Sequence, residues 1–91
     1  MKRYFVYALW SPSHSRLYIG LTSNLKIRLE QHNSGKTRSN RYYRPWKVLK
    51  VEETTDLNSA RQLELKWKGG SFRERFRELA KHKFGVNGRN D

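Results

Sequence analysis

The sequence predicts a small α/β domain of the α+β type, with its elements in the order strand, strand, helix, strand, helix, helix. Two observations predict this class: three short runs rich in β-branched and aromatic residues, and three longer segments whose apolar residues recur every three or four positions. The short runs are residues 4–10, 16–20 and 46–51, and the longer segments are residues 25–32, 57–68 and 71–83. Because no repeat or long linker divides these elements, we expect one domain over residues 1–83 and a flexible tail over residues 84–91.

The first two strands are expected to pair as a hairpin. Residues 4–10 are apolar or aromatic at every position, which is typical of a central strand buried on both faces, and residues 11–15 have the composition of a turn. If the paired positions sum to 25, Tyr7 and Tyr18 lie opposite each other on one face, and if they sum to 26, the two side chains face apart. The sequence is compatible with either register.

Capping residues mark the ends of the predicted helices. Residues 22–24 (Thr-Ser-Asn) can each accept a hydrogen bond from the first turn of the first helix, and residues 33–35 (Asn-Ser-Gly) end that helix. Asp56 can cap the second helix, which residues 69–70 (Gly-Gly) end. Residues 71–74 match a capping box that opens the third helix.

The composition indicates a polyanionic partner. Twenty lysines and arginines stand against eight acidic residues, which gives a net charge of +12, more than solubility requires. The chain has no cysteine, which excludes a disulfide scaffold and a cysteine-bound zinc ion and fits a reducing cytoplasm. No stretch approaches the roughly 20 apolar residues of a membrane span, so a membrane is not an expected partner.

A basic loop with aromatic residues is expected between the first helix and the third strand. Its cations and tyrosines suit contacts with phosphates and stacking on bases, so we predict that it binds nucleic acid. The predicted contact residues are Lys36, Arg38, Arg41, Tyr42, Tyr43 and Arg44. The alternative is a solvated loop whose tyrosines pack onto the core. Arg73, at the start of the last helix, belongs to a second set of cations that either binds phosphate or is solvated.

Glu64 is the most unusual residue of the sequence, because it projects into the middle of the apolar stripe of the second helix. That stripe consists of Leu57, Ala60, Leu63 and Trp67. A carboxylate on the side of a helix that faces the core costs several kcal/mol unless it is paired or binds a metal ion. The alternative to a metal site is a buried salt bridge from Glu64 to Arg28 or to a lysine.

Four further side chains complete a hypothesis about the chemistry of the site. Tyr7 and Tyr18 lie on the two strands of the hairpin, and Arg28 and His32 lie one turn apart on the first helix, beside its buried face. Glu64 can hold one divalent cation whose other ligands are water and phosphate oxygens, and such a cation polarises a phosphodiester. A tyrosine can accept the proton of the attacking water if Arg28 lowers its pKa, and Arg28 can also clamp a phosphate oxygen. His32 can relay a proton or hold a phosphate or a tyrosine hydroxyl. Together these residues predict a one-metal phosphodiesterase.

The order of these residues resembles the GIY-YIG nuclease domain. The matching positions are the triplets Phe5-Val6-Tyr7 and Tyr18-Ile19-Gly20, followed by Arg28 and Glu64. Residues 24–33 are also similar to the first helix of that family, and the resemblance covers about residues 4–80. The chain looks like the small single-domain bacterial members, which are related to the N-terminal nuclease domain of the incision subunit of nucleotide-excision repair.

The resemblance implies a three-stranded antiparallel sheet flanked by helices, and hydrolysis of DNA phosphodiester bonds with one divalent ion, Mg²⁺ or Mn²⁺. By this resemblance the family tyrosines map to Tyr7 and Tyr18, the helix arginine to Arg28, the histidine of some members to His32, the glycine of the second triplet to Gly20 and the metal-binding glutamate to Glu64. Which tyrosine is the general base stays open. A role in DNA repair or recombination is implied only at the level of the family.

The sequence departs from the family pattern at two positions, of which only the second bears on activity. Phe5 stands where the family name has glycine, and Leu21 stands where some repair-type members have a lysine that helps to activate the base. The leucine at position 21 implies either lower activity or another cation in that role, for which Lys26 and Lys66 are the candidates. No second acidic residue convincingly joins Glu64, so a two-metal site is not expected. Without an appended recognition domain, the structure of the nucleic acid rather than its sequence should decide what is cut.

The sequence leaves several partners and functions open. DNA is the expected partner, RNA also fits, and a separate protein can supply specificity. The main alternative function is a non-catalytic nucleic-acid-binding module that keeps the fold, which the net charge and the basic loop motivate. A structural or protein-interaction role is the third function.

Overall fold

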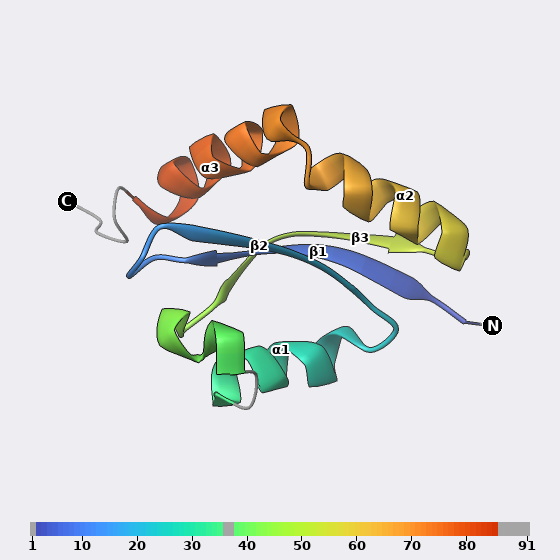
Figure 1. Ribbon diagram of the computed structural model, residues 1–91, viewed down its shortest axis with the longest axis horizontal. Helices are drawn as coiled ribbons and strands as arrows, with labels where there is room; N and C mark the ends of the chain where they lie inside the picture. Colours follow the sequence, from blue (N-terminus) through green and yellow to red (C-terminus); the bar gives the residue numbers. More distant parts are fainter. Residues whose placement is uncertain (1, 36–37, 86–91) are drawn as a thin grey trace.

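The chain folds into a three-stranded sheet with helices on both faces (Figure 1). The computed structural model describes residues 2–35 and 38–85. Its elements are β1 (Tyr4–Ser11), β2 (Arg16–Thr22), α1 (Leu25–Ser34), the 3₁₀ helix η1 (Arg38–Tyr43), β3 (Lys47–Thr54), α2 (Leu57–Trp67) and α3 (Gly70–Phe84). The predicted class and order of elements are confirmed, with η1 added where the sequence predicts a loop. The helix α3 continues one residue past the predicted end of the domain, and residues 86–91 of the predicted tail lie outside the described residues.

The central strand of the sheet is β1. The strand order is β2-β1-β3, and both neighbours pair antiparallel with β1. Residues 6–9 of β1 are fully buried, as expected for a strand that is apolar at every position. The strand β3 lies at an edge of the sheet, which agrees with the exposed Lys47 and Lys50 that it contains.

The hairpin adopts neither of the two registers that the sequence analysis considers. Its paired positions sum to 27, which places Tyr7 opposite Gly20. The reason is the length of the turn, because residues 12–15 all lie between the strands and Ser15 adopts a positive φ of 50°. A sum of 25 or 26 would require a shorter turn. In the observed register Tyr7 and Tyr18 share one face of the sheet as diagonal neighbours.

Each face of the sheet has its own hydrophobic core. Alternate residues of β1 point to opposite faces, with Val6, Ala8 and Trp10 on the face that α2 and α3 cover and Tyr7 and Leu9 on the face that α1 and η1 cover (Figure 1). The first core is completed by Leu17, Ile19, Leu49, Ala60, Trp67, Phe76 and Ala80. The second core is smaller and surrounds the polar side chains of the site described below.

Most of the predicted helix ends are confirmed. The Asn24 side chain caps α1 by accepting a hydrogen bond from a backbone N–H of the first turn (3.2 Å), and Gly35 ends α1 in the left-handed region (φ 85°). Asp56 caps α2 in the same way (2.9 Å). The capping box predicted for residues 71–74 is wrong, because α3 begins at Gly70 and Ser71 already lies inside its first turn.

The apolar stripe predicted for α2 is largely confirmed, and α3 also buries apolar side chains on one face. Ala60 and Trp67 of α2, and Phe76 and Ala80 of α3, are buried. Leu79 of α3 is 43% exposed, because Ala80 takes the position nearest the sheet and the preceding residue is rotated away by about 100°. Among the described helices, none has the length and apolar content needed to cross a membrane.

Candidate active site

Four side chains that the sequence predicts to share one site meet on the α1 face of the sheet. They are Tyr7 from β1, Tyr18 from β2, and Arg28 and His32 from α1, and we call them the tyrosine cluster. The ring centroids of Tyr7 and Tyr18 are 6.2 Å apart, and that of His32 lies 5.9 Å from Tyr7 and 4.7 Å from Tyr18. His32 therefore packs against both tyrosines.

A buried hydrogen bond joins Tyr7 to His32. The Tyr7 Oη and the His32 Nε2 are 3.1 Å apart, and both side chains are fully buried. Burial, together with the positive charge of Arg28, lowers the pKa of His32 to about 4. Burial also raises the pKa of Tyr7 to about 12, although a hydrogen bond from Arg28 acts in the opposite direction. At neutral pH both groups are uncharged, and with the imidazole proton on Nδ1 the Tyr7 hydroxyl donates to Nε2.

Arg28 supplies the positive charge of the tyrosine cluster. Its Nη1 donates to the side-chain oxygen of Gln31 (3.0 Å), and hydrogen bonding to Tyr7 raises the pKa of Arg28, with a smaller contribution from Tyr18. Within the described residues, no carboxylate lies within 4.0 Å of the guanidinium nitrogens. The charge of Arg28 is therefore available to an anion such as a phosphate group.

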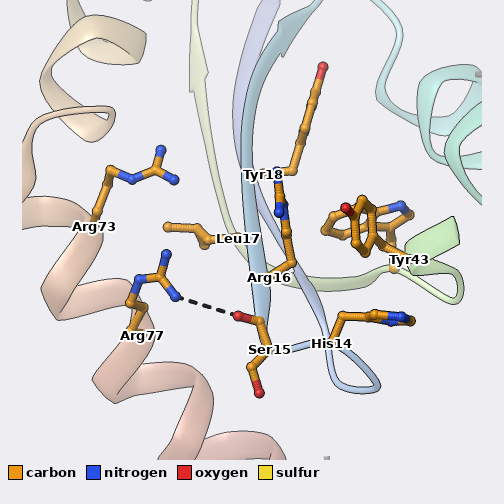
Figure 2. Close-up of a pocket in the computed structure, with 9 residues that line it drawn as sticks. His14, Ser15, Arg16, Leu17, Tyr18, Tyr43, Arg73 and Arg77 are labelled. Carbon is orange, nitrogen blue, oxygen red and sulfur yellow. Dashed lines mark hydrogen bonds between the residues drawn. The ribbon is translucent and has the colours of Figure 1, made fainter. Parts of the chain in front are cut away.

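Tyr18 differs from Tyr7 in its access to solvent. Tyr7 is fully buried, whereas Tyr18 is half-buried and lines a cleft of about 550 Å³ beside β2 (Figure 2). Of the two tyrosines, Tyr18 is therefore the one placed to contact a ligand in the cleft.

Gly20 allows the two tyrosines to pack closely. A methyl group in place of its α-hydrogen would lie 2.5 Å from the Cζ and Oη atoms of Tyr7 and 2.9 Å from Cε1 of Tyr18. Gly20 pairs with Tyr7 across the hairpin, so the phenol ring lies over the glycine backbone. This close approach gives a physical reason for glycine at this position.

Glu64, the fifth predicted site residue, lies on α2, which covers the opposite face of the sheet from α1 (Figure 1). Its Oε2 is 3.2 Å from the Lys68 Nζ, and its side chain is 23% exposed. The prediction that the Glu64 carboxylate faces the core is therefore wrong. Of the two partners considered for a salt bridge, Arg28 and a lysine, the structure shows the lysine. The helical wheel gives the direction of a side chain, whereas the length of glutamate lets its carboxylate reach the surface.

The partner of Glu64 in the structure is a lysine, which competes with any metal ion for the carboxylate. Among the residues that the structure describes, no three histidine, cysteine or acidic side chains are grouped so that they could hold a metal ion. An ion bound by Glu64 alone would complete its coordination shell with water and phosphate oxygens, as Mg²⁺ commonly does. Such an ion would have to share the carboxylate with Lys68 or displace it.

The two tyrosines of the predicted basic loop have different environments. Tyr42 is 82% exposed, so it is accessible for stacking on a base. Tyr43 is half-buried, packs against Trp46 with ring centroids 6.0 Å apart, and has the Arg16 guanidinium 4.8 Å above its ring. The prediction of a binding loop therefore suits Tyr42, and the alternative of tyrosines packed onto the core suits Tyr43.

The structure describes the side chains of only some of the predicted cations of the loop. Arg41 Nε donates to a backbone carbonyl at the end of α1 (3.1 Å), and Arg44 Nε donates to the carbonyl of Arg41 (3.0 Å). Lys36 lies outside the described residues, and for Arg38 only the backbone within η1 is described. Arg73, from α3, lines the cleft (Figure 2).

A paired amide contact that the sequence does not reveal holds α1 against the sheet. The Asn33 Oδ1 accepts a hydrogen bond from the backbone N–H of Trp46 (2.6 Å), and the Asn33 Nδ2 donates to the carbonyl of Trp46 (3.2 Å). The sequence indicates only that Asn33 lies at the end of a helix. Its contact with Trp46 spans the whole basic loop, so no local pattern signals it.

Comparison with known proteins decides the family. The model of the GIY-YIG catalytic domain matches residues 3–82. The chain belongs to the GIY-YIG family. It is 36% identical over 86 residues to a UPF0213 protein from Lactiplantibacillus plantarum, and the match covers 90% of this chain and 83% of that protein. It is also similar to the solution NMR structure of a UPF0213 protein from Bacillus halodurans, with a TM-score of 0.51 and 25% identity, covering 94% of this chain and 90% of that one. GIY-YIG domains are generally nucleases.

The buried histidine of this GIY-YIG chain is expected to make its stability depend on pH. Because the pKa of His32 falls from 6.5 to about 4 on folding, the unfolded chain takes up a proton first as the pH drops. The contribution of neutral His32 to the free energy of unfolding is roughly 3 kcal/mol. This contribution is complete above about pH 6.5 and is lost as the pH falls to about 4. Urea unfolding at a series of pH values measures it.

The control for this GIY-YIG stability test is a matched pair of variants. His32→Gln does not titrate, so its unfolding free energy should fall less than that of the wild type between pH 6.5 and 4. His82→Gln removes an exposed histidine and should keep the wild-type profile. Parallel profiles for the wild type and His32→Gln would contradict the expectation.

Proposed function

We propose that this chain is a divalent-metal-dependent endonuclease that hydrolyses DNA phosphodiester bonds by a one-metal mechanism, with low sequence specificity. The observation that carries the proposal is the tyrosine cluster, in which an arginine without a carboxylate partner in the described residues lies beside two phenol hydroxyls at the edge of a cleft. The +12 net charge and the family's general nuclease activity support a nucleic acid as substrate.

The proposed roles follow from burial and charge. Tyr18 is half-buried and lines the cleft, so its phenol oxygen, once deprotonated, is the one proposed to contact the attacking water and take its proton. Tyr7 stays protonated because burial raises its pKa to about 12, so it is a positioning residue, held by His32. Arg28 would bind a non-bridging phosphate oxygen and stabilise the negative charge that grows there during the reaction.

Glu64 is the proposed ligand of the divalent ion, Mg²⁺ or Mn²⁺. When bound, such an ion polarises the scissile phosphate and stabilises the departing oxyanion. A cation that binds Glu64 would displace the Lys68 ammonium group from the carboxylate or share the carboxylate with it. The remaining positions of the coordination shell suit water and the phosphate.

Replacing the two tyrosines separately tests these roles. Tyr18→Phe should lower kcat by roughly 10²–10⁴-fold, because it removes the proposed proton acceptor. Tyr7→Phe should lower kcat less and should lower the unfolding free energy by about 1 kcal/mol, since the imidazole loses a hydrogen-bond partner. Tyr42→Phe removes an exposed hydroxyl outside the tyrosine cluster but keeps the ring that is available for stacking, so it serves as the control. A larger loss of kcat in Tyr7→Phe than in Tyr18→Phe would show that Tyr7 is the proton acceptor and Tyr18 the positioning residue.

The second candidate function is a nucleic-acid-binding module without catalysis. The excess of arginines over carboxylates around the cleft favours this function as much as it favours a nuclease. The test is an assay of highly purified protein on labelled single-stranded, duplex and branched DNA and on RNA, with Mg²⁺, Mn²⁺ or EDTA. Cleavage that EDTA abolishes supports the nuclease, and binding without cleavage in any condition supports the module.

The proposed cellular setting of the nuclease is inferred from its composition and from its family. A cysteine-free chain suits a reducing compartment, and we propose the cytoplasm. DNA repair or recombination is the proposed process, and a partner protein would supply the sequence specificity that the chain itself is not expected to have. Recovery of the chain with tagged DNA-repair proteins after DNA damage would test that setting.

A further inference from the structure

The cleft beside β2 lies between two parts of the chain that are distant in sequence. On one side are the end of the β1–β2 hairpin and Tyr43, and on the other side is the first half of α3 (Figure 2). Tyr18 lines one part of the cleft and also belongs to the tyrosine cluster. Tyr18 therefore connects the cleft with the proposed site of hydrolysis.

Three arginines surround this cleft, and their contacts leave their charges uncompensated. Arg73 and Arg77 lie one turn apart on α3 and extend toward β2, and Arg16 lies on the opposite side (Figure 2). The Arg77 Nη1 donates to the carbonyl of Ser15 (3.4 Å), and Arg16 stacks over the ring of Tyr43 (4.8 Å). In the described part of the chain, no carboxylate lies within 4.0 Å of any of these three guanidinium groups.

The charges of α3 are divided between its faces. Glu74, Arg75 and Glu78 line a different hollow, on a side of the helix away from the cleft. The acidic residues of α3 are therefore grouped with Arg75, while Arg73 and Arg77 face the cleft without them. Like charges held together without counter-ions repel one another, and an anion in the cleft would relieve that repulsion.

We infer that the cleft binds a backbone phosphate of the DNA strand next to the phosphate that is cut, with Arg16, Arg73 and Arg77 as its ligands. Guanidinium groups offer paired N–H donors that match phosphate oxygens, and stacking on Tyr43 fixes the plane of Arg16. The inference rests on the proposed function for the identity of the strand. The role of this phosphate site is to set the position of the DNA strand relative to Tyr18 and Arg28.

The test measures DNA binding in EDTA, where no metal-dependent cleavage occurs, over a series of salt concentrations. The Arg73→Gln/Arg77→Gln variant should lower the slope of log K against log salt by about 1 per arginine and weaken binding at 0.1 M salt on the order of tenfold per arginine. Arg75→Gln removes the same charge from the other side of α3 and should change the slope little. Arg73→Lys/Arg77→Lys keeps the charges and should keep most of the slope.

A second measurement locates the bound phosphate. DNA strands that carry one uncharged methylphosphonate at successive positions should bind the wild type more weakly at one position beside the scissile phosphate. The Arg73→Gln/Arg77→Gln variant should not distinguish that position from its neighbours, because the contact is already lost. Thermal unfolding of each variant separates a lost contact from a lost fold.

The outcomes separate this inference from the proposed function. Equal salt slopes for Arg73→Gln/Arg77→Gln and Arg75→Gln would overturn the phosphate site, even if the wild type cleaves DNA. Arginine-dependent binding without cleavage in Mg²⁺ or Mn²⁺ would overturn the nuclease and leave the phosphate site in place. An undiminished methylphosphonate effect in the double variant would also overturn the site.

Discussion

Glu64→Gln is expected to abolish metal-dependent DNA cleavage while leaving DNA binding intact. The substitution keeps the size of the side chain but removes the charge that would hold the divalent ion, and we expect cleavage to fall by on the order of a thousandfold or more. DNA affinity should stay the same or rise, because the protein loses one negative charge. Cleavage assays with Mg²⁺ and Mn²⁺, and binding in EDTA, measure both quantities on the same preparations.

Two control variants separate a metal ligand from an ion-pair partner. Lys68→Met breaks the 3.2 Å ion pair but keeps the carboxylate, so cleavage should persist. Glu78→Gln removes a carboxylate from α3, away from the tyrosine cluster, and should leave cleavage unchanged. Wild-type cleavage by Glu64→Gln would show that this residue serves only its ion pair with Lys68. The half-exposed pair should add at most about 1 kcal/mol to stability, so neither substitution is expected to unfold the chain.

Gly20→Ala is expected to give the largest loss of stability of any single methyl group added to the sheet. The new carbon would lie 2.5 Å from the ring of Tyr7, which is fully buried and bonded to His32 and therefore has no free space to enter. Such overpacking typically costs about 1–3 kcal/mol, and here it also displaces the tyrosine cluster. Urea unfolding and the cleavage assay should both report the loss.

A double-mutant cycle isolates this contact. In a Tyr7→Leu background the ring is absent, so adding Gly20→Ala should cost at least about 1 kcal/mol less than it does in the wild type. Gly70→Ala is the control, because nothing lies within 4 Å of the added carbon and alanine favours a helix. Equal costs of Gly20→Ala in both backgrounds would show that the close approach to Tyr7 is not the cause.

Local patterns were sufficient to predict most of the fold. The apolar run of β1, the caps Asn24 and Asp56, and the glycine that ends α1 each act within a few residues, so the sequence shows them directly. The hairpin register was missed because it depends on the length of a turn that tolerates several conformations. The start of α3 was missed because a matching capping box lay one residue inside the helix.

The site was predictable in its residue types but not in its geometry. Spacing on a helix places Arg28 and His32 on one side, and the structure brings both beside the tyrosines. That Tyr7 is buried while Tyr18 reaches a cleft depends on packing between distant elements, which no local pattern encodes. The same holds for Arg16 and Arg77, whose common cleft forms only when α3 packs beside β2.

The alternation of side chains along β1 limits how the gene can change in length. Val6 and Ala8 belong to the larger core, and Tyr7 between them belongs to the tyrosine cluster. Inserting or deleting one codon within β1 would exchange the two sets, placing a phenol hydroxyl among apolar side chains and leaving His32 without its partner. Such a frame-preserving change would remove stability and chemistry together, so natural length variation should be confined to the connections, such as residues 12–15 and the segment between α1 and β3.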